Sequence, residues 1–302
     1  MDFLISGTHI NPVYLIIIGF IIGICGGFFG VGGSFLAGPA LFAFGVPMNF
    51  VVGTDLAHIV GKSIVAAKKH RALGNVDIKL GLIMASATIV GVETGAQIIQ
   101  QLKRHKNVDV VVAMAFIIVL VGISSFITWE CWQTQKMGTN APGKPKQDRS
   151  AIAHIAKRFH RFHLPPMISL PNSGIKQISL WTILAVAYIG GVFSGFLGGG
   201  AGYIRMPALV YILGVPTHVA VGTDLFEVVI SASYGMFSHA IKGNVDILIA
   251  LVMHTGAAIG AQIGATLTQY FHGTRIRLAF VPLPLLGAGL IIYSLVTGHY
   301  FK

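Results

Sequence analysis

A block of glycine, proline and polar residues occurs twice in the chain, and this duplication constrains the fold more than any other feature. The tetrapeptide Gly-Thr-Asp-Leu stands at 53–56 and again at 222–225. Each copy follows a glycine-rich stretch and a proline, and each precedes a Gly-Asn-Val-Asp sequence, at 74–77 and 243–246. Matching positions are 168 residues apart up to the proline and 169 residues apart after it. Two hydrophobic units interrupted at matching places are typical of membrane proteins built from internal repeats with broken helices.

The composition places these units in a lipid bilayer. The 302 residues are 54% hydrophobic and only 10% charged, whereas soluble globular proteins carry about 25% charged residues. Apolar runs of about 20 residues are candidates for membrane-spanning helices. We therefore predict an all-α polytopic protein of the cell (inner) membrane, with about eight spans and two short re-entrant or half-helix pieces. The predicted spans are 13–30, 50–67, 80–102, 108–129, 180–197, 217–238, 247–271 and 277–297, and the short pieces are 34–46 and 203–213.

The same pattern divides the chain into a first repeat at 1–130, a polar central loop at 131–178 and a second repeat at 179–302. Within the loop, residues 151–163 carry apolar and basic residues on opposite helical faces, which predicts an amphipathic helix on anionic membrane lipid. The net charge of +11 would suggest nucleic acid as the partner of a soluble chain. In a membrane protein the positive-inside rule explains it, and we expect no nucleic-acid partner.

The span count decides how the two repeats are oriented. Eight simple spans with both termini inside would place 14 of the 21 Lys and Arg residues on the inner side, among them Lys68 and Lys242. If the short apolar pieces instead turn back within the membrane, or cross it, the repeats become inverted rather than parallel.

Glycines interrupt the first apolar helix of each half. Unwound backbone is stable within a membrane only where protein buries it or where it lines a wet cavity. Its free N–H groups, together with the N-terminus of the helix that follows, can bind an anion. The alternative is close packing of helices through small residues, which we also expect at Gly91, Gly95, Gly260 and Gly264. The candidate binding glycines are Gly30, Gly32 and Gly33 in the first half and Gly198, Gly200 and Gly202 in the second.

Few ionisable residues lie within the predicted spans, and each costs about 2.5–3.5 kcal/mol to insert. Asp55, His58 and Lys62 share one helical face because they are spaced i, i+3 and i+7. The repeat offset maps them to Asp224, Glu227 and Ser231 in the second half. We therefore predict two related polar faces that meet at a central site.

The residue types on these faces suit a small anion. Lys62 and Arg205 are permanent cations that could neutralise it, and Thr54 and Thr223 could bind it. Asp55, Asp224, Glu227 and His58 would then carry protons or hold ion pairs. The alternative is structural pairing, of Lys62 with Asp55 or Asp224 and of Arg205 with Glu227. Glu93 is expected to bridge helices, and His70 and His239 are expected at the membrane interface.

The doubled pattern of glycine break, proline, Gly-Thr-x-Leu and Gly-Asn-Val-Asp resembles the TauE/SafE sulfite-exporter family, also called the four-toluene-sulfonate uptake permease family. The resemblance covers about 23–97 and 191–265. It implies an inner-membrane carrier for sulfur-containing anions that uses an ion or proton gradient. It also implies binding roles for the glycine breaks, Thr54 and Thr223. Many family members have Ser after that threonine, whereas this chain has Asp55 and Asp224, and an added carboxylate disfavours an anion unless it is paired or protonated.

We therefore predict a secondary transporter, an exporter of sulfite, thiosulfate or organosulfonates, that works by alternating access with a coupling ion or proton. The alternatives are a passive anion channel and a cation or metal carrier that uses the acidic second-half face. An enzyme is not expected, because the spans contain no HExxH, GxSxG or paired His/Cys ligands. No cofactor and no bound metal are expected, and the sequence leaves the oligomeric state open.

Overall fold

The computed structural model describes residues 1–104, 108–139 and 164–298, and helices make up most of this part of the chain. Within it, eight helices are long and apolar enough to cross a membrane. They coincide with the eight predicted spans, so the prediction of an all-α polytopic membrane protein is confirmed. The amphipathic helix predicted at 151–163 lies outside the described residues.

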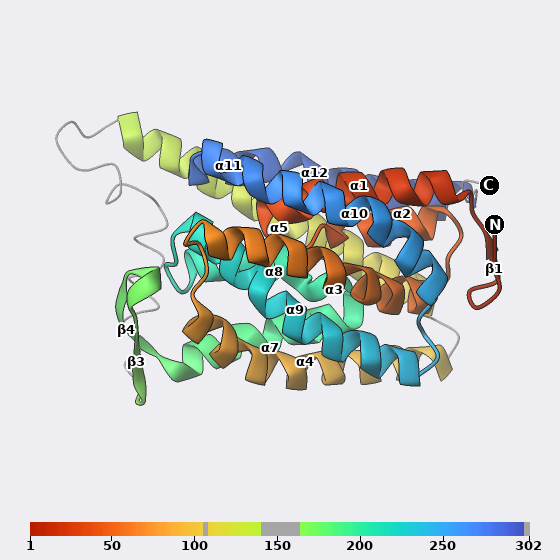
Figure 1. Ribbon diagram of the computed structural model, residues 1–302, viewed down its shortest axis with the longest axis horizontal. Helices are drawn as coiled ribbons and strands as arrows, with labels where there is room; N and C mark the ends of the chain where they lie inside the picture. Colours follow the sequence, from red (N-terminus) through yellow and green to blue (C-terminus); the bar gives the residue numbers. More distant parts are fainter. Residues whose placement is uncertain (105–107, 140–163, 299–302) are drawn as a thin grey trace.

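Each repeat begins with a β-hairpin and continues with a matching series of helices, except that α11 and α12 of the second repeat stand where the first has the single helix α5 (Figure 1). Neither hairpin could be predicted from the sequence, because such short strands carry too little period-two alternation to recognise. The first repeat comprises β1 (Asp2–Phe3), β2 (Thr8–His9), α1 (Pro12–Phe29), α2 (Ser34–Ala43), α3 (Met48–Ala72), α4 (Ile78–Arg104) and α5 (Val108–Thr139). The second comprises β3 (Met167–Leu170), η2 (Pro171–Ser173), β4 (Ile175–Ser179), α7 (Leu180–Leu197), η3 (Gly199–Ala201), α8 (Gly202–Tyr211), α9 (Thr217–Ile241), α10 (Ile247–Leu267), η4 (Thr268–Tyr270), α11 (Gly273–Phe280) and α12 (Pro282–Thr297).

The first helix of each repeat is broken and turns back, as the glycines predicted. Gly30 ends α1 with φ of +74°, a left-handed conformation that costs glycine little and other residues more. The chain then reverses, so that Gly33 packs against Ile22 while the ring of Phe44 stacks on Tyr14 with 6.4 Å between centroids. α2 is therefore a half-helix that runs antiparallel to α1.

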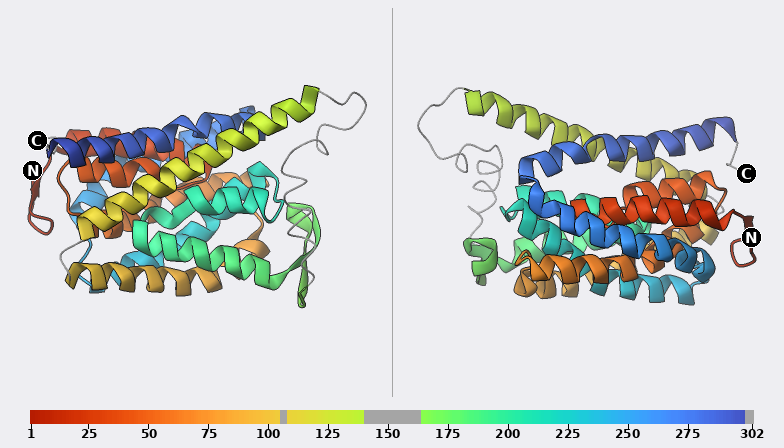
Figure 2. Two further views of the ribbon diagram at one scale, coloured as in Figure 1. Left: turned by 180° about the vertical axis from the view of Figure 1, so that it is seen from behind. Right: turned by 45° about the horizontal axis from the view of Figure 1, so that its top comes forward.

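The two repeats exchange their first helices. α1 packs along α10 of the second repeat, and α7 packs along α4 of the first (Figure 2). Glycines make both contacts close: Gly23 of α1 meets the backbone of Ala257, and Gly91 of α4 meets the backbone of Tyr188. Gly95, Gly260 and Gly264 pack in the same way, so the predicted packing role of these small residues is confirmed. The first helix of each half therefore packs mainly against the other half.

α3 and α9, which are equivalent helices, cross at the centre of the molecule in opposite directions. Gly53 near the start of α3 contacts His239 near the end of α9, and Gly222 near the start of α9 contacts His70 near the end of α3. Leu56 meets Gly235 between these points. Two equivalent helices that run antiparallel are related by an axis in the membrane plane, so the repeats are inverted.

Inversion changes which basic residues share an end of the molecule. β1–β2 and both termini lie at one end in Figure 1, and β3–β4 lies at the other. The parallel arrangement of eight simple spans, which put Lys242 on the same side as Lys68, is therefore wrong; α2 and α8 turn back within the bundle, and each repeat makes an odd number of net crossings. Among the described basic residues, Lys68, Lys69, Arg71, Lys79, Lys176, Arg275 and Arg277 lie at the β3–β4 end, and Lys103, Arg104 and Lys242 lie at the β1–β2 end.

The contacts of α1 with α10 and of α7 with α4 depend on glycines, which have no side chain. Adding a single methyl group at one of these glycines tests that dependence. A Cβ at Gly91 would overlap the backbone of α7, whereas Gly122 of α5 has nothing within 4 Å of such a position. We expect Gly91→Ala to destabilise the protein by about 1–3 kcal/mol through overpacking. Gly122→Ala should be neutral or slightly stabilising, because alanine is the better helix former. Thermal unfolding of both variants in detergent measures the difference, and equal unfolding temperatures would contradict the packing role.

Candidate functional site

The two glycine breaks meet at the centre of the molecule, as the sequence predicted. The Ser34 hydroxyl at the start of α2 donates to the Gly199 carbonyl oxygen across the repeats at 2.6 Å. Gly32 also packs against Gly199, and Gly202 packs against Val31. A side chain at these glycines would separate the loops, so the glycines serve both close packing and the unwinding that frees backbone groups.

The first-half polar face of α3 lies beside this contact and is closed to solvent. Asp55 is 0%, His58 1% and Lys62 2% exposed. His58 Nδ1 lies 3.3 Å from Asp55 Oδ1, and the second carboxylate oxygen of Asp55 lies close to Gly199. Within the described residues, Lys62 Nζ has no hydrogen-bond or ion-pair partner. The structural pairing of Lys62 with Asp55 or Asp224 is therefore absent from this structure.

The second-half face carries a closed ion-pair cluster instead. Arg205 reaches from α8 to α9, where its Nε donates to Asp224 Oδ1 at 2.8 Å and its Nη1 pairs with Glu227 Oε2. All three side chains are 0% exposed, and the Ser231 hydroxyl donates to Glu227 Oε2 at 3.3 Å. The predicted pair of Arg205 with Glu227 is present and extends to Asp224. The equivalent of Arg205 in the first repeat is Ala37, so the two halves differ in charge.

The two threonines of Gly-Thr-Asp-Leu connect the repeats. The Thr54 hydroxyl accepts a hydrogen bond from the backbone N–H of Asp246, and the Thr223 hydroxyl accepts one from Asp77, both at 2.9 Å. Gly53 packs on the carbonyl of Asn244 and Gly222 on that of Asn75. Each Gly-Thr-Asp-Leu thus meets the Gly-Asn-Val-Asp of the other repeat, and we call each contact a clasp. A substrate role for Thr54 and Thr223 stays a prediction.

Each clasp extends to one of the β-hairpins. Ser6, between β1 and β2, donates from its hydroxyl to Asp246 Oδ2 at 2.7 Å, and Ser173, between β3 and β4, donates to Asp77 Oδ2 at 2.7 Å. The other oxygen of each aspartate accepts backbone N–H groups at the start of α10 or α4. Asp77 and Asp246 therefore also cap α4 and α10. Asp109 differs, because its carboxylate accepts from the Met48 N–H and so caps α3.

His70 and His239 stand near the ends of α3 and α9, but their side chains are buried between helices and do not face lipid or water. Both are 0% exposed. His70 Nε2 lies 3.0 Å from the Gly27 carbonyl oxygen of α1, and His239 Nε2 lies 2.9 Å from the Gly195 carbonyl oxygen of α7. Each imidazole fits because the neighbouring residue on the crossing helix is Gly222 or Gly53. The histidines therefore tie each broken helix to the end of α3 or α9.

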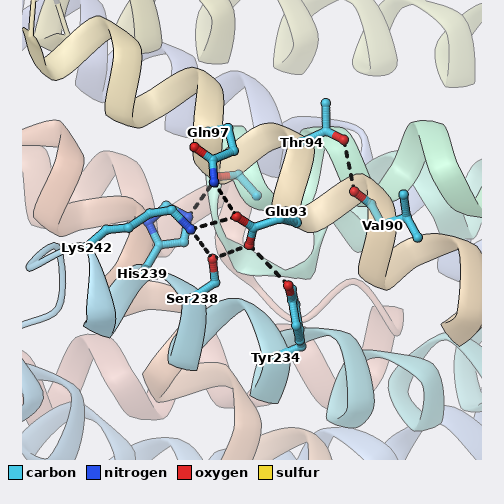
Figure 3. A network of polar contacts seen from close by, with 9 residues as sticks. Val90, Glu93, Thr94, Gln97, Tyr234, Ser238, His239 and Lys242 are labelled. Atoms are coloured by element: carbon cyan, nitrogen blue, oxygen red, sulfur yellow. Dashed lines mark hydrogen bonds and ion pairs between the residues drawn. The ribbon is translucent and has the colours of Figure 1, made fainter.

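Glu93 bridges α4 and α9, as expected from the sequence (Figure 3). Its carboxylate accepts hydrogen bonds from Ser238 Oγ at 2.6 Å, Lys242 Nζ at 2.9 Å and Tyr234 Oη at 3.2 Å. The equivalent residue in the second repeat is Gln262. This network lies outside the central polar faces, so we assign it to helix packing.

Because the two clasps are equivalent, we expect the loss of either one to destabilise the protein by a similar amount. Thr54→Val keeps the side-chain shape but leaves the buried Asp246 N–H without an acceptor, which costs about 1–3 kcal/mol. Thr223→Val should cost a similar amount through Asp77. Thr255→Val is the control, because that exposed hydroxyl donates only to Val252 of its own helix. Unfolding temperatures in detergent compare the three, and a clasp variant as stable as the control would contradict the role.

Three central residues escaped the sequence analysis. Tyr203 is completely buried on α8, within electrostatic range of Asp55. His254 of α10 packs against Gly61, beside Lys62, and Ser34 joins the loops. Tyr203 lies one residue after a glycine break, which was a usable signal. His254 carried none, because the packing of α10 against α3 of the other repeat cannot be read from the sequence.

Comparison with known proteins agrees with this architecture. The profile of the family described as sulfite exporter TauE/SafE matches residues 15–291. The chain is 25% identical to the probable membrane transporter protein YunE of Bacillus subtilis, over 92% of this chain and 97% of that protein. It is 24% identical to YdhB of the same organism, over 92% and 99%. A 38% identical match to MJ0441 of Methanocaldococcus jannaschii, also a probable membrane transporter protein, covers 25% of this chain and 31% of that one. No solved structure matches significantly.

Proposed function

The chain belongs to the TauE/SafE sulfite exporter family and is a membrane transporter, and we propose that it is a secondary transporter, an exporter, of small sulfur-containing anions such as sulfite, thiosulfate or organosulfonates. The proposal includes alternating access and coupling to an ion or a proton. These finer statements rest on the central polar faces, as follows.

Lys62 is the observation that carries the proposal. A buried ammonium group without a partner is costly, and natural proteins keep such groups where a ligand completes them. Lys62 lies on α3 close to the midpoint of the α3–α9 crossing, between the contacts that Gly53 and His70 make at its two ends. An anion that binds there would satisfy Nζ, and the free N–H groups of the adjacent glycine loops would add to the attraction.

The second half argues against a cation carrier. The acidic face that favoured this alternative consists of Asp224 and Glu227, and Arg205 already pairs with both. A metal ion would have to displace a buried guanidinium from two ion pairs, which leaves a charge uncompensated in a low dielectric. Lys62 is the cation of the described centre that has no ion pair, and an anionic substrate would supply one.

Two features support alternating access: the repeats are inverted, and the central polar faces are closed to solvent. The polar faces are closed to solvent at both ends, so a substrate can reach them only after helices move. Inverted repeats allow one conformation to open toward one side and its symmetry-related conformation to open toward the other. The clasps are equivalent contacts at opposite ends, and we propose that opening either end separates one clasp. Because the described basic residues concentrate at the β3–β4 end, we propose that this end is cytoplasmic.

The charges of the buried central side chains support coupling of anion movement to a proton. With neutral histidine, the three carboxylates of Asp55, Asp224 and Glu227 outnumber the two cations, Lys62 and Arg205. An anion added to such a cluster is repelled unless a proton or cation arrives as well. We therefore propose that anion movement is accompanied by a proton bound in the cluster.

Flux measurements in proteoliposomes test the proposal. We expect sulfite efflux that saturates with concentration and responds to an imposed pH gradient. Liposomes that contain Lys62→Met protein at equal density are the control for leak, since this variant lacks the unpaired cation. Flux that rises linearly with concentration and ignores the pH gradient would indicate a channel, and absence of flux or binding with any sulfur anion would refute the proposed substrate class.

A further inference from the structure

The unpartnered polar atoms of the first-half face form a site with both donors and acceptors. Lys62 Nζ and Tyr203 Oη are donors without a partner in the described part of the chain, and Asp55 Oδ2 is an acceptor without one. All three side chains are at most 2% exposed. Asp55 and Lys62 share one face of α3, and Asp55 Oδ2 lies beside Gly199, four residues before Tyr203, so the three groups belong to the same central part of the fold.

His58 adds a second acceptor to this region. Its Nδ1 lies 3.3 Å from Asp55 Oδ1, and only a protonated Nδ1 can donate to a carboxylate. In the neutral imidazole, Nε2 then carries the lone pair, and this atom is buried without a partner among the described residues. A ligand here therefore faces two donors, Lys62 and Tyr203, and two acceptors, Asp55 and His58.

A simple oxyanion fits only half of this arrangement. Its oxygens accept hydrogen bonds from Lys62 and Tyr203, but they would also face Asp55 Oδ2, a charged acceptor that repels them. The second half does not relieve this repulsion, because Arg205 is held by Asp224 and Glu227 and does not pair with Asp55. An anion that carries its own O–H or N–H group avoids the conflict by donating to Asp55.

We infer that the site selects an oxyanion that bears its own hydrogen-bond donor, and that Asp55 determines this specificity. The inference rests on the proposed anion transport and narrows its substrate class. Hydrogensulfite is the simplest sulfur anion of this kind: it has one negative charge, oxygens for Lys62 and Tyr203, and one proton for Asp55. Dianions lack the donor and add a second charge to a cluster that already has an excess of carboxylates.

Two monoanions of similar size separate the effect of the donor from the effect of charge. Methanesulfonate has the same charge as hydrogensulfite and oxygens that accept hydrogen bonds, but it has no O–H or N–H group to donate. We expect purified protein, in mildly acidic buffer where hydrogensulfite predominates, to bind it at least about tenfold more tightly than methanesulfonate, because the mismatched anion leaves a buried charged acceptor unpaired. Equal affinities for the two anions would overturn the inference.

Asp55→Asn then tests the residue. The variant removes the repulsive charge, so methanesulfonate should bind more tightly and the ratio of the two affinities should fall toward one. Glu93→Gln is the matched control, because it removes one carboxylate outside the site and should keep the wild-type ratio. If Asp55→Asn kept the wild-type ratio of the two affinities, Asp55 would not determine the specificity. If Asp55→Asn does not fold, the wild-type comparison still decides the donor requirement. Absence of binding for both anions would refute anion transport itself, which is a different outcome.

Discussion

Arg205→Met is expected to destabilise the folded protein strongly. The guanidinium pairs with Asp224 and Glu227, and its removal leaves two carboxylates side by side at 0% exposure. Breaking a buried ion pair from one side typically costs about 3–5 kcal/mol, because the remaining charge is uncompensated. For a chain of this size that corresponds to a fall in unfolding temperature of roughly 10 °C. Extraction yield and thermal unfolding in detergent measure it.

Two further variants separate the loss of charge balance from the loss of the arginine itself. The triple variant Arg205→Met, Asp224→Asn, Glu227→Gln removes all three charges and should recover much of the stability. Arg275→Met is the matched single change, because Arg275 is exposed on α11. Arg205→Met with the unfolding temperature of Arg275→Met would show that the cluster contributes nothing to folding.

Lys62→Met is expected to have the opposite profile, with normal folding and no transport. Methionine keeps most of the side-chain volume, and no carboxylate lies within 4.0 Å of Lys62 Nζ among the described residues to be left unpaired. The unfolding temperature should therefore change by only a few degrees, less than about 1 kcal/mol. Anion binding should fall at least about tenfold, since the loss of a charged hydrogen bond in a buried site costs about 1.5–3 kcal/mol.

Lys68→Met provides the control within the same helix. Lys68 is exposed near the end of α3, so its removal should leave binding and flux unchanged. A Lys62→Met protein that is folded and still transports sulfite at the wild-type rate would remove Lys62 from the substrate site. A Lys62→Met protein that unfolds like Arg205→Met would mean that Lys62 is part of the structural charge network.

The spans, the glycine breaks and the central polar faces could be predicted because each depends on short-range pattern. Apolar length identifies a span, and i, i+3, i+7 spacing places Asp55, His58 and Lys62 on one face whatever surrounds them. The repeat offset could then align these residues with the second half. The packing glycines of α4 and α10 were predicted for the same reason.

The contacts between repeats could not be predicted, because they depend on which helices are neighbours. Thr54 looked like a substrate ligand while its partner was unknown, and the structure gives it Asp246 from the other repeat. His70 and His239 looked interfacial because they stand near helix ends, yet Gly222 and Gly53 on the crossing helices leave space that buries them. His254 reaches the centre because α10 of the second repeat packs against α3 of the first.

The exchange of first helices has a consequence for biosynthesis. α7 emerges from the ribosome when its partner α4 is already made, whereas α1 must wait for α10, which begins at Ile247. At about 5–20 residues per second, that wait lasts roughly 10–50 s. During it, the glycine face of α1 at Gly19, Gly23 and Gly27 has no helix to receive it and must be covered by lipid or by the insertion machinery. The nascent chain therefore passes through a stage in which α1, its first helix, still lacks its main packing partner although α2 to α9 have been made.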